Sequence, residues 1–130
     1  MTQKRKAQKL CSQLISHNFL KNELYWKQAE ILNKLYKDNL FHYMEKGDVW
    51  EVFSSNIGIP ATTSFKKVAN YRFFIEKHGL KIEEVAELDV MSLELIKSKG
   101  KNLKTTKIRE AMKTVKKTNR ASFFSEFMKN

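Results

Sequence analysis

The chain has very few residues that interrupt a helix, because only one proline and four glycines occur in 130 residues. Proline and glycine are the strongest local breaks in regular structure, so their scarcity leaves long segments free to form helices. Apolar residues recur at helical spacings of three and four, and we find no convincing strand-like alternation. The sequence therefore predicts an all-α fold, a compact multi-helix domain.

The periodicity predicts seven helices. We expect them over residues 3–16, 20–37, 49–57, 60–78, 81–88, 90–98 and 105–117, followed by an apolar tail. The pattern weakens near His17 and Asn18, which predicts a basic N-terminal helix or arm over 1–19 and a helical domain over 20–130. A single domain agrees with the length of the chain.

The apolar stripe along each helix predicts its buried face. The expected core residues are Leu20, Leu24, Ile31 and Leu35, widened by Tyr25, Ala29, Leu32 and Tyr36; then Val49, Val52, Phe53 and Ile57; and then Phe65, Val68, Ala69 and Phe73.

The segment GIPATTSFKKV predicts a tight turn between two helices. Gly58 can adopt the left-handed conformation that ends a helix, and Pro60 tolerates the start of the next one. Ile59 is a lone apolar residue that should enter the core. Two helices joined in this way predict a helix-turn-helix, whose second helix meets base edges in the major groove of DNA.

The second helix of this pair should present polar side chains if Phe65 and Val68 face the core. Hydroxyl and amide groups can hydrogen-bond base edges, and a lysine can reach phosphate or guanine. The predicted DNA contacts on this helix are Thr62, Thr63, Ser64, Lys66, Lys67 and Asn70, with Thr62 or Thr63 also able to cap it.

The net charge of +11 is concentrated near the C-terminus, where residues 91–130 hold eleven Lys or Arg against three Asp or Glu. Such a patch attracts a polyanion, because each neutralised phosphate releases condensed counterions. We therefore expect double-stranded DNA as partner, with further contacts from Lys99, Lys101, Lys104 and Lys107. A solvated helix surface is the alternative explanation of the charge.

Four stretches give residues 28–117 a resemblance to a helix-turn-helix module of plasmid and phage proteins, related in style to partition and plasmid-regulator DNA-binding domains. The stretches are AEILNKLYKDNLF, VWEVFSSNIGIPATTSFKKV, HGLKIEEVAELD and NLKTTKIREAMKTVKK, and the recognition segment matches at Gly58, Ile59, Thr63, Phe65, Lys66 and Val68. Pro60 replaces a usual serine, and Ala61 replaces a polar or basic residue. The resemblance implies DNA binding by a regulator or partition-type factor of a mobile genetic element.

Other function classes find little support in the sequence. No apolar run approaches the roughly 18 residues that a membrane span needs. The histidines are scattered, and neither a phosphate-binding glycine loop nor a nucleophile elbow occurs. We therefore expect no enzyme, metal or cofactor. Cys11 is the only cysteine, which precludes an internal disulfide and favours a cytoplasmic protein, nucleoid-associated when bound to DNA.

Two alternatives concern partners. The tail ASFFSEFMKN should fold back onto the core or pair with a second copy, and a homodimer could use this tail or the N-terminal helix. The main alternative function is a helical protein-interaction module, such as a phage-encoded inhibitor or adaptor. RNA binding is a weaker third hypothesis, since no loop combines clustered aromatic and basic residues. DNA binding would favour one continuous basic face that joins Lys66 and Lys67 to the lysines of 97–107.

Overall fold

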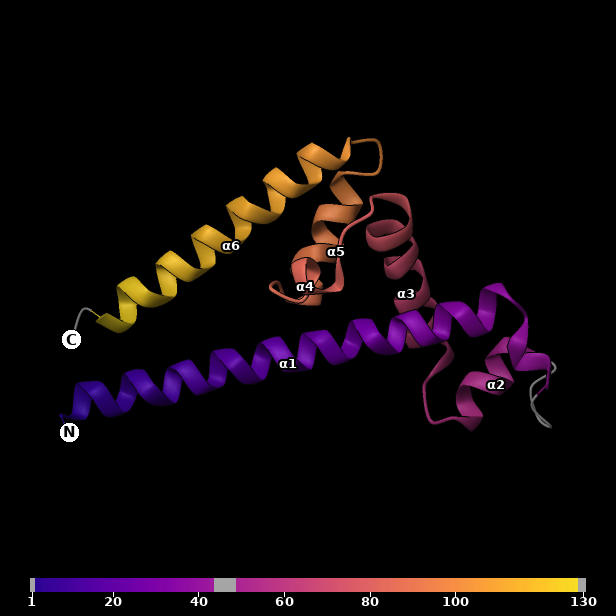
Figure 1. The fold of residues 1–130 in the computed structure, drawn as a ribbon, viewed down its shortest axis with the longest axis horizontal. Helices are drawn as coiled ribbons and strands as arrows, with labels where there is room; N and C mark the ends of the chain where they lie inside the picture. The colour runs from indigo at the N-terminus through magenta and orange to yellow at the C-terminus, as the bar shows by residue number, and fades with distance from the viewer. Residues whose placement is uncertain (1, 44–48, 129–130) are drawn as a thin grey trace. The chain divides into compact units, whose positions relative to one another are not determined.

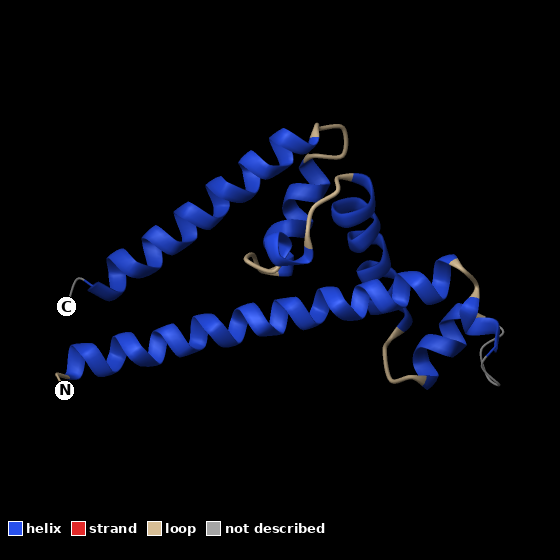
Figure 2. Cartoon of the chain, in the orientation of Figure 1, coloured by secondary structure: helices blue, strands red, loops and turns tan. Residues whose placement is uncertain are grey.

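The computed structural model describes residues 2–43 and 49–128, without the side chains of residues 42 and 117–128. All regular structure in these residues is helical, which confirms the predicted fold class (Figure 2). The elements are α1 (Gln3–Lys37), η1 (Leu40–Tyr43), α2 (Trp50–Asn56), α3 (Ala61–Tyr71), η2 (Arg72–Lys77), α4 (Ile82–Val85), α5 (Val90–Lys99) and α6 (Thr105–Met128). They form two compact units, one of residues 24–82 and one of residues 1–23 with 83–130.

Helix α1 runs without interruption for 35 residues (Figure 1). The predicted break near His17 and Asn18 is wrong, because both side chains are exposed and the weaker apolar pattern there does not disturb the backbone hydrogen bonds of the helix. The segment 1–19 is therefore not a separate helix. The border between the two compact units falls inside α1, after Glu23.

The buried face of α1 differs from the predicted stripe. Leu20, Leu24 and Ile31 are 57–60% exposed, so the prediction that they face the core is wrong. The ring of Trp26 packs instead against Phe74, with 5.9 Å between ring centroids. One large aromatic ring buries more apolar area than a leucine and so decides how the helix is rotated. The buried residues of α1 are Trp26, Ala29, Leu32 and Asn33.

An aromatic cluster around Trp50 forms the core beneath α2 and α3. The Trp50 ring lies 5.1 Å from Tyr36 and 5.3 Å from both Phe41 and Phe53, measured between centroids. Edge-on and tilted ring pairs of this kind stabilise a core beyond their buried area. Leu32 and Val68 complete the cluster, and Leu35 and Ile59 pack against it.

The turn between α2 and α3 follows the predicted geometry at Gly58, whose φ of 84° lies in the left-handed region. Ile59 is half-buried against the aromatic cluster, and its carbonyl accepts a 2.6 Å hydrogen bond from the Ser54 hydroxyl. Helix α3 begins at Ala61 with Pro60 as N-cap and no side-chain cap. The predicted capping by threonine is therefore wrong, since Thr62 and Thr63 already lie in the first turn.

The predicted buried side of α2 is correct only in part. Phe53 is buried as predicted, whereas Val49, Val52 and Ile57 are 45–52% exposed. Trp50 takes the inward position next to Phe53, and a short helix of seven residues can bury only one side.

In the other unit, α5 and α6 pack against each other. A side chain on the buried Gly100 would meet the Ile96 carbonyl oxygen at 2.8 Å and the Ile108 Cδ1 at 2.9 Å, so glycine permits this close approach. Asn22 of α1 donates to the Ala86 carbonyl at 3.1 Å within the same unit. Helix α6 continues through the predicted tail to Met128. The apolar side chains of this tail are not among the side chains that the structure describes.

Candidate nucleic-acid interface

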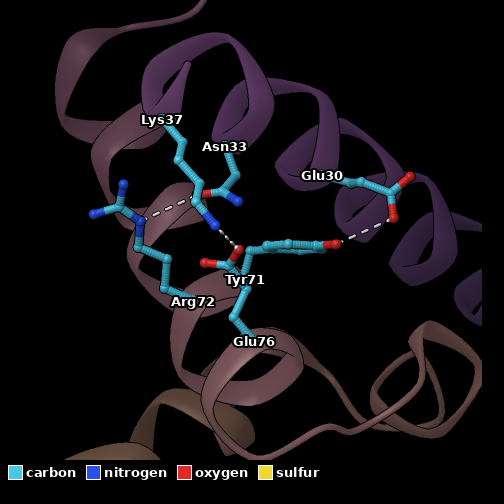
Figure 3. A network of polar contacts seen from close by, with 6 residues as sticks. All are labelled: Glu30, Asn33, Lys37, Tyr71, Arg72 and Glu76. Atoms are coloured by element: carbon cyan, nitrogen blue, oxygen red, sulfur yellow. Dashed lines mark hydrogen bonds and ion pairs between the residues drawn. The ribbon is translucent and has the colours of Figure 1, made fainter. Parts of the chain in front are cut away.

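Three polar pairs fix the rotation of α3 and η2 against the end of α1 (Figure 3). We call these residues the α1 clamp: Glu30 with Tyr71, Asn33 with Arg72, and Lys37 with Glu76. Their donor–acceptor distances are 3.1–3.2 Å. Each pair joins residues about 40 positions apart. One pair involves the last residue of α3 and two involve η2, so a rotation of this continuous helical segment would break them.

The tyrosine in the clamp is held in its protonated form. Burial raises the pKa of the Tyr71 phenol, and the neighbouring Glu30 carboxylate raises it further by charge and by accepting its hydrogen bond. A phenolate beside that carboxylate would be disfavoured by repulsion. Tyr71 therefore remains a hydrogen-bond donor to Glu30 at neutral pH.

Two predicted DNA contacts are engaged with α1 instead. Asn70 is 3% exposed and donates to the Tyr25 hydroxyl at 3.0 Å, so the prediction that it lies on an open surface is wrong. The Lys67 ammonium donates to the Gln28 side-chain oxygen at 2.8 Å and lies 5.1 Å from the centroid of the Tyr25 ring. Burial lowers the pKa of Lys67.

Ser64 is a structural residue of the core. It is fully buried, accepts a hydrogen bond from Trp50 Nε1 at 3.1 Å, and donates to the Ala61 carbonyl at 3.0 Å. The prediction that Ser64 faces DNA is therefore wrong. A small hydroxyl can be buried in this way because it has a hydrogen-bond partner both as donor and as acceptor.

A different set of side chains lies open on α3. Phe65 is 38% exposed and Ala69 is exposed, so the prediction that both belong to the core is wrong, whereas Val68 and Phe73 are buried as expected. Thr63 is half-buried. Counted from Thr62, the other exposed residues lie three, four and seven positions later, which places them on one side of the helix. We call them the α3 open face: Thr62, Phe65, Lys66 and Ala69.

The predicted lysines of the other unit are exposed around the connection between α5 and α6. Lys99 ends α5, Lys101 and Lys104 lie in the connection, and Lys107 lies in the first turn of α6. Lys107 also forms a 3.4 Å ion pair with Glu110, which is exposed and so contributes little to stability. We call these four residues the α5–α6 lysine cluster.

Part of the basic charge of α6 is neutralised inside this unit. Arg109 donates to both carboxylate oxygens of Glu84, at 3.1 and 3.3 Å, and Lys116 forms an ion pair with Glu87. Periodicity could not find these pairs because their partners are 25 and 29 residues apart. The acidic residues near α4 therefore bind to cations of α6.

The predicted contacts belong to two different compact units: those on α3 to residues 24–82, and the α5–α6 lysine cluster to the other unit. Among the described residues, no group of three or more His, Cys, Asp or Glu side chains could hold a metal ion. Within the same residues, every helix is too short or too polar to cross a bilayer.

Comparison of the chain with family models, curated proteins and solved structures gave no match.

Proposed function

We propose that this protein binds double-stranded DNA and uses α2, the turn at Gly58 and α3 as a helix-turn-helix. In this proposal α3 enters the major groove, and the protein serves as a regulator or partition-type factor of a mobile genetic element. The observation that carries the proposal is the uncovered side of α3. Thr62, Phe65, Lys66 and Ala69 are exposed there, while the rest of α3 packs against α1 and the aromatic cluster.

The geometry of the turn supports this proposal. A left-handed Gly58 followed by the half-buried Ile59 holds α2 and α3 in a fixed relation through the Ser54 hydrogen bond. The α1 clamp adds a second restraint on α3. A helix held from two sides can present its side chains to a groove with little ordering on binding, which favours affinity.

The charge of the molecule supports a phosphate-rich partner. The net charge is +11, and the α5–α6 lysine cluster places four cationic side chains within nine residues of sequence. Phosphate contacts from such lysines position a protein on DNA without specifying sequence. The α3 open face and the lysine cluster thus supply the two kinds of contact that a sequence-specific DNA-binding protein needs.

Titration against random duplex DNA at several salt concentrations tests the proposal. Lys66→Ala, Lys101→Ala and Lys104→Ala should each weaken binding and reduce the slope of log affinity against log salt by about one unit. Lys34→Ala, which removes an exposed lysine of α1, is the matched control and should keep the wild-type slope. An unchanged slope in all three interface variants would contradict the proposal.

A second candidate function, a helical protein-interaction module, is favoured by one observation on α1. Leu10, Leu14 and Leu20, which lie in one compact unit, are 57–62% exposed, and a series of large aliphatic side chains on one helix is a common feature of helix-pairing surfaces. This surface could serve a homodimer or another protein. Sedimentation velocity tests it: Leu14→Glu should abolish any self-association, whereas Ser12→Glu, at an exposed position about 160° around the helix from Leu14, should preserve it.

A further inference from the structure

The α3 open face has a distinctive chemical composition. Thr62 and Ala69 present methyl groups, Phe65 presents a phenyl ring, and Lys66 is the charged member of the set. The short polar side chains of the same helix, Ser64 and Asn70, are turned away and hydrogen-bonded inside the protein. The face therefore combines apolar groups with one hydroxyl, that of Thr62, and one cation, that of Lys66.

Two charged residues further along the same helical segment, Arg72 and Glu76, are engaged in the α1 clamp. Arg72 donates to Asn33 and its guanidinium lies 5.2 Å from the Tyr36 ring centroid, while Glu76 pairs with Lys37 (Figure 3). Bidentate recognition of adenine needs an asparagine or glutamine, and that of guanine needs an arginine or lysine. Of these residue types, the α3 open face offers only Lys66.

One base edge in the major groove matches an apolar surface. Adenine, guanine and cytosine present hydrogen-bonding groups there, whereas thymine also presents its C5-methyl group. Threonine methyl, alanine and phenylalanine are the side chains that contact this methyl group. The α3 open face holds one of each within eight residues.

Phe65 is held in place before any ligand arrives. Its ring centroid lies 6.2 Å from that of Tyr36 and 6.4 Å from that of Trp50, so one side of the ring rests on the aromatic cluster. The ring is nevertheless part of a residue that is 38% exposed. An anchored ring loses little conformational freedom on binding, so the burial of a methyl group against it contributes fully to affinity.

We propose that the α3 open face recognises thymine in duplex DNA through the C5-methyl group, with Phe65 and Thr62 as the principal contacts. The proposal rests on the proposed DNA-binding function and specifies which base that function selects. Lys66 supplies the charge complementarity, because its ammonium lies on the same face and can reach a phosphate beside the contacted base.

The test replaces thymine by uracil, which lacks the C5-methyl group and keeps the same hydrogen-bonding edge. A duplex is selected from a randomised pool by the wild-type protein and then synthesised with thymine or with deoxyuridine. The uracil duplex should bind more weakly by about fourfold for each methyl group contacted, the affinity equivalent of one buried methylene.

Variants assign the preference to the named side chains. Phe65→Ala should reduce the thymine-to-uracil ratio towards one, and Thr62→Ser, which removes one methyl group and keeps the hydroxyl, should reduce it in part. Tyr43→Ala is the matched control, because it removes an 86% exposed aromatic side chain outside α3, and it should keep the full ratio. Thermal melts of each variant establish that it is folded.

The outcomes separate this inference from the proposed function. Duplex binding with thymine and uracil affinities within twofold of each other overturns thymine recognition and leaves DNA binding intact. An unchanged ratio in both Phe65→Ala and Thr62→Ser overturns the assigned contacts, since DNA shape would then cause the preference. Failure to bind any duplex overturns the proposed function itself, and this inference with it.

Discussion

Replacement of Ser64 by alanine tests whether α3 is rotated as described. Ser64 is fully buried and Trp50 is 4% exposed, and 3.1 Å separates Trp50 Nε1 from the Ser64 hydroxyl oxygen. The variant removes the acceptor and leaves a buried indole N–H without it, which costs about 1–3 kcal/mol. Alanine is the better helix former by about 0.5 kcal/mol, which offsets part of this cost. The expected net loss in the free energy of unfolding is about 1–2 kcal/mol.

Urea denaturation followed by tryptophan fluorescence and by circular dichroism measures this loss. Thr62→Ala is the matched control, since Thr62 is an exposed hydroxyl residue of the same helix, and it should stay within about 0.5 kcal/mol of the wild type. A double-mutant cycle with Trp50→Phe should show coupling of about 1 kcal/mol, because the second substitution finds the hydrogen bond already lost. A Ser64→Ala variant as stable as Thr62→Ala would refute the described rotation of α3.

Three further predictions follow from the interior of the protein. Asn70→Ala should lower the free energy of unfolding by about 1–2 kcal/mol, because it removes a buried partner of the Tyr25 hydroxyl; a loss below about 0.5 kcal/mol in a urea melt would place Asn70 at the surface. Burial, assisted by the charge of Lys77, lowers the pKa of His78 in the folded protein. The unfolded chain therefore takes up a proton at higher pH than the folded protein does, and the free energy of unfolding should fall as the pH drops below about 6.5. His78→Asn should flatten this decline in melts between pH 5 and 8, whereas the exposed His17→Asn should keep it. Phe65→Ala should cost about 1–2 kcal/mol, less than the roughly 3–5 of a fully buried ring, because Phe65 is 38% exposed; a loss above about 3 kcal/mol would place the ring in the core.

The sequence was sufficient to predict the helical class, the turn at Gly58 and most helix positions, because these depend on local periodicity and on glycine and proline chemistry. It failed at His17 and Asn18, where a weak apolar pattern suggested a break. Periodicity describes which side of a helix is apolar, whereas helix continuity depends on backbone hydrogen bonds that exposed polar residues do not interrupt.

Helix rotation was the main feature that the sequence could not determine. Both α1 and α3 carry more apolar side chains than one face can bury, so several rotations satisfy the pattern. The choice is made by partners distant in sequence, such as Trp26 with Phe74 and Trp50 with Ser64. A buried serine or asparagine becomes stable only when its partner is in place, and a single sequence does not reveal that partner.

This rotation changes the expected chemistry of the candidate site. With Phe65 inward, α3 would have offered hydroxyl, amide and lysine side chains to DNA and would have read bases by hydrogen bonds. With Ser64 and Asn70 inward, the same helix offers methyl groups, a phenyl ring and Lys66. A rotation of α3 about its axis by roughly 100°, the angle between successive residues, therefore replaces a hydrogen-bonding surface by one that suits the methyl group of thymine. Under the proposed DNA-binding function, the pairs of the α1 clamp would help to hold that rotation, and their residues would then influence base preference without touching DNA.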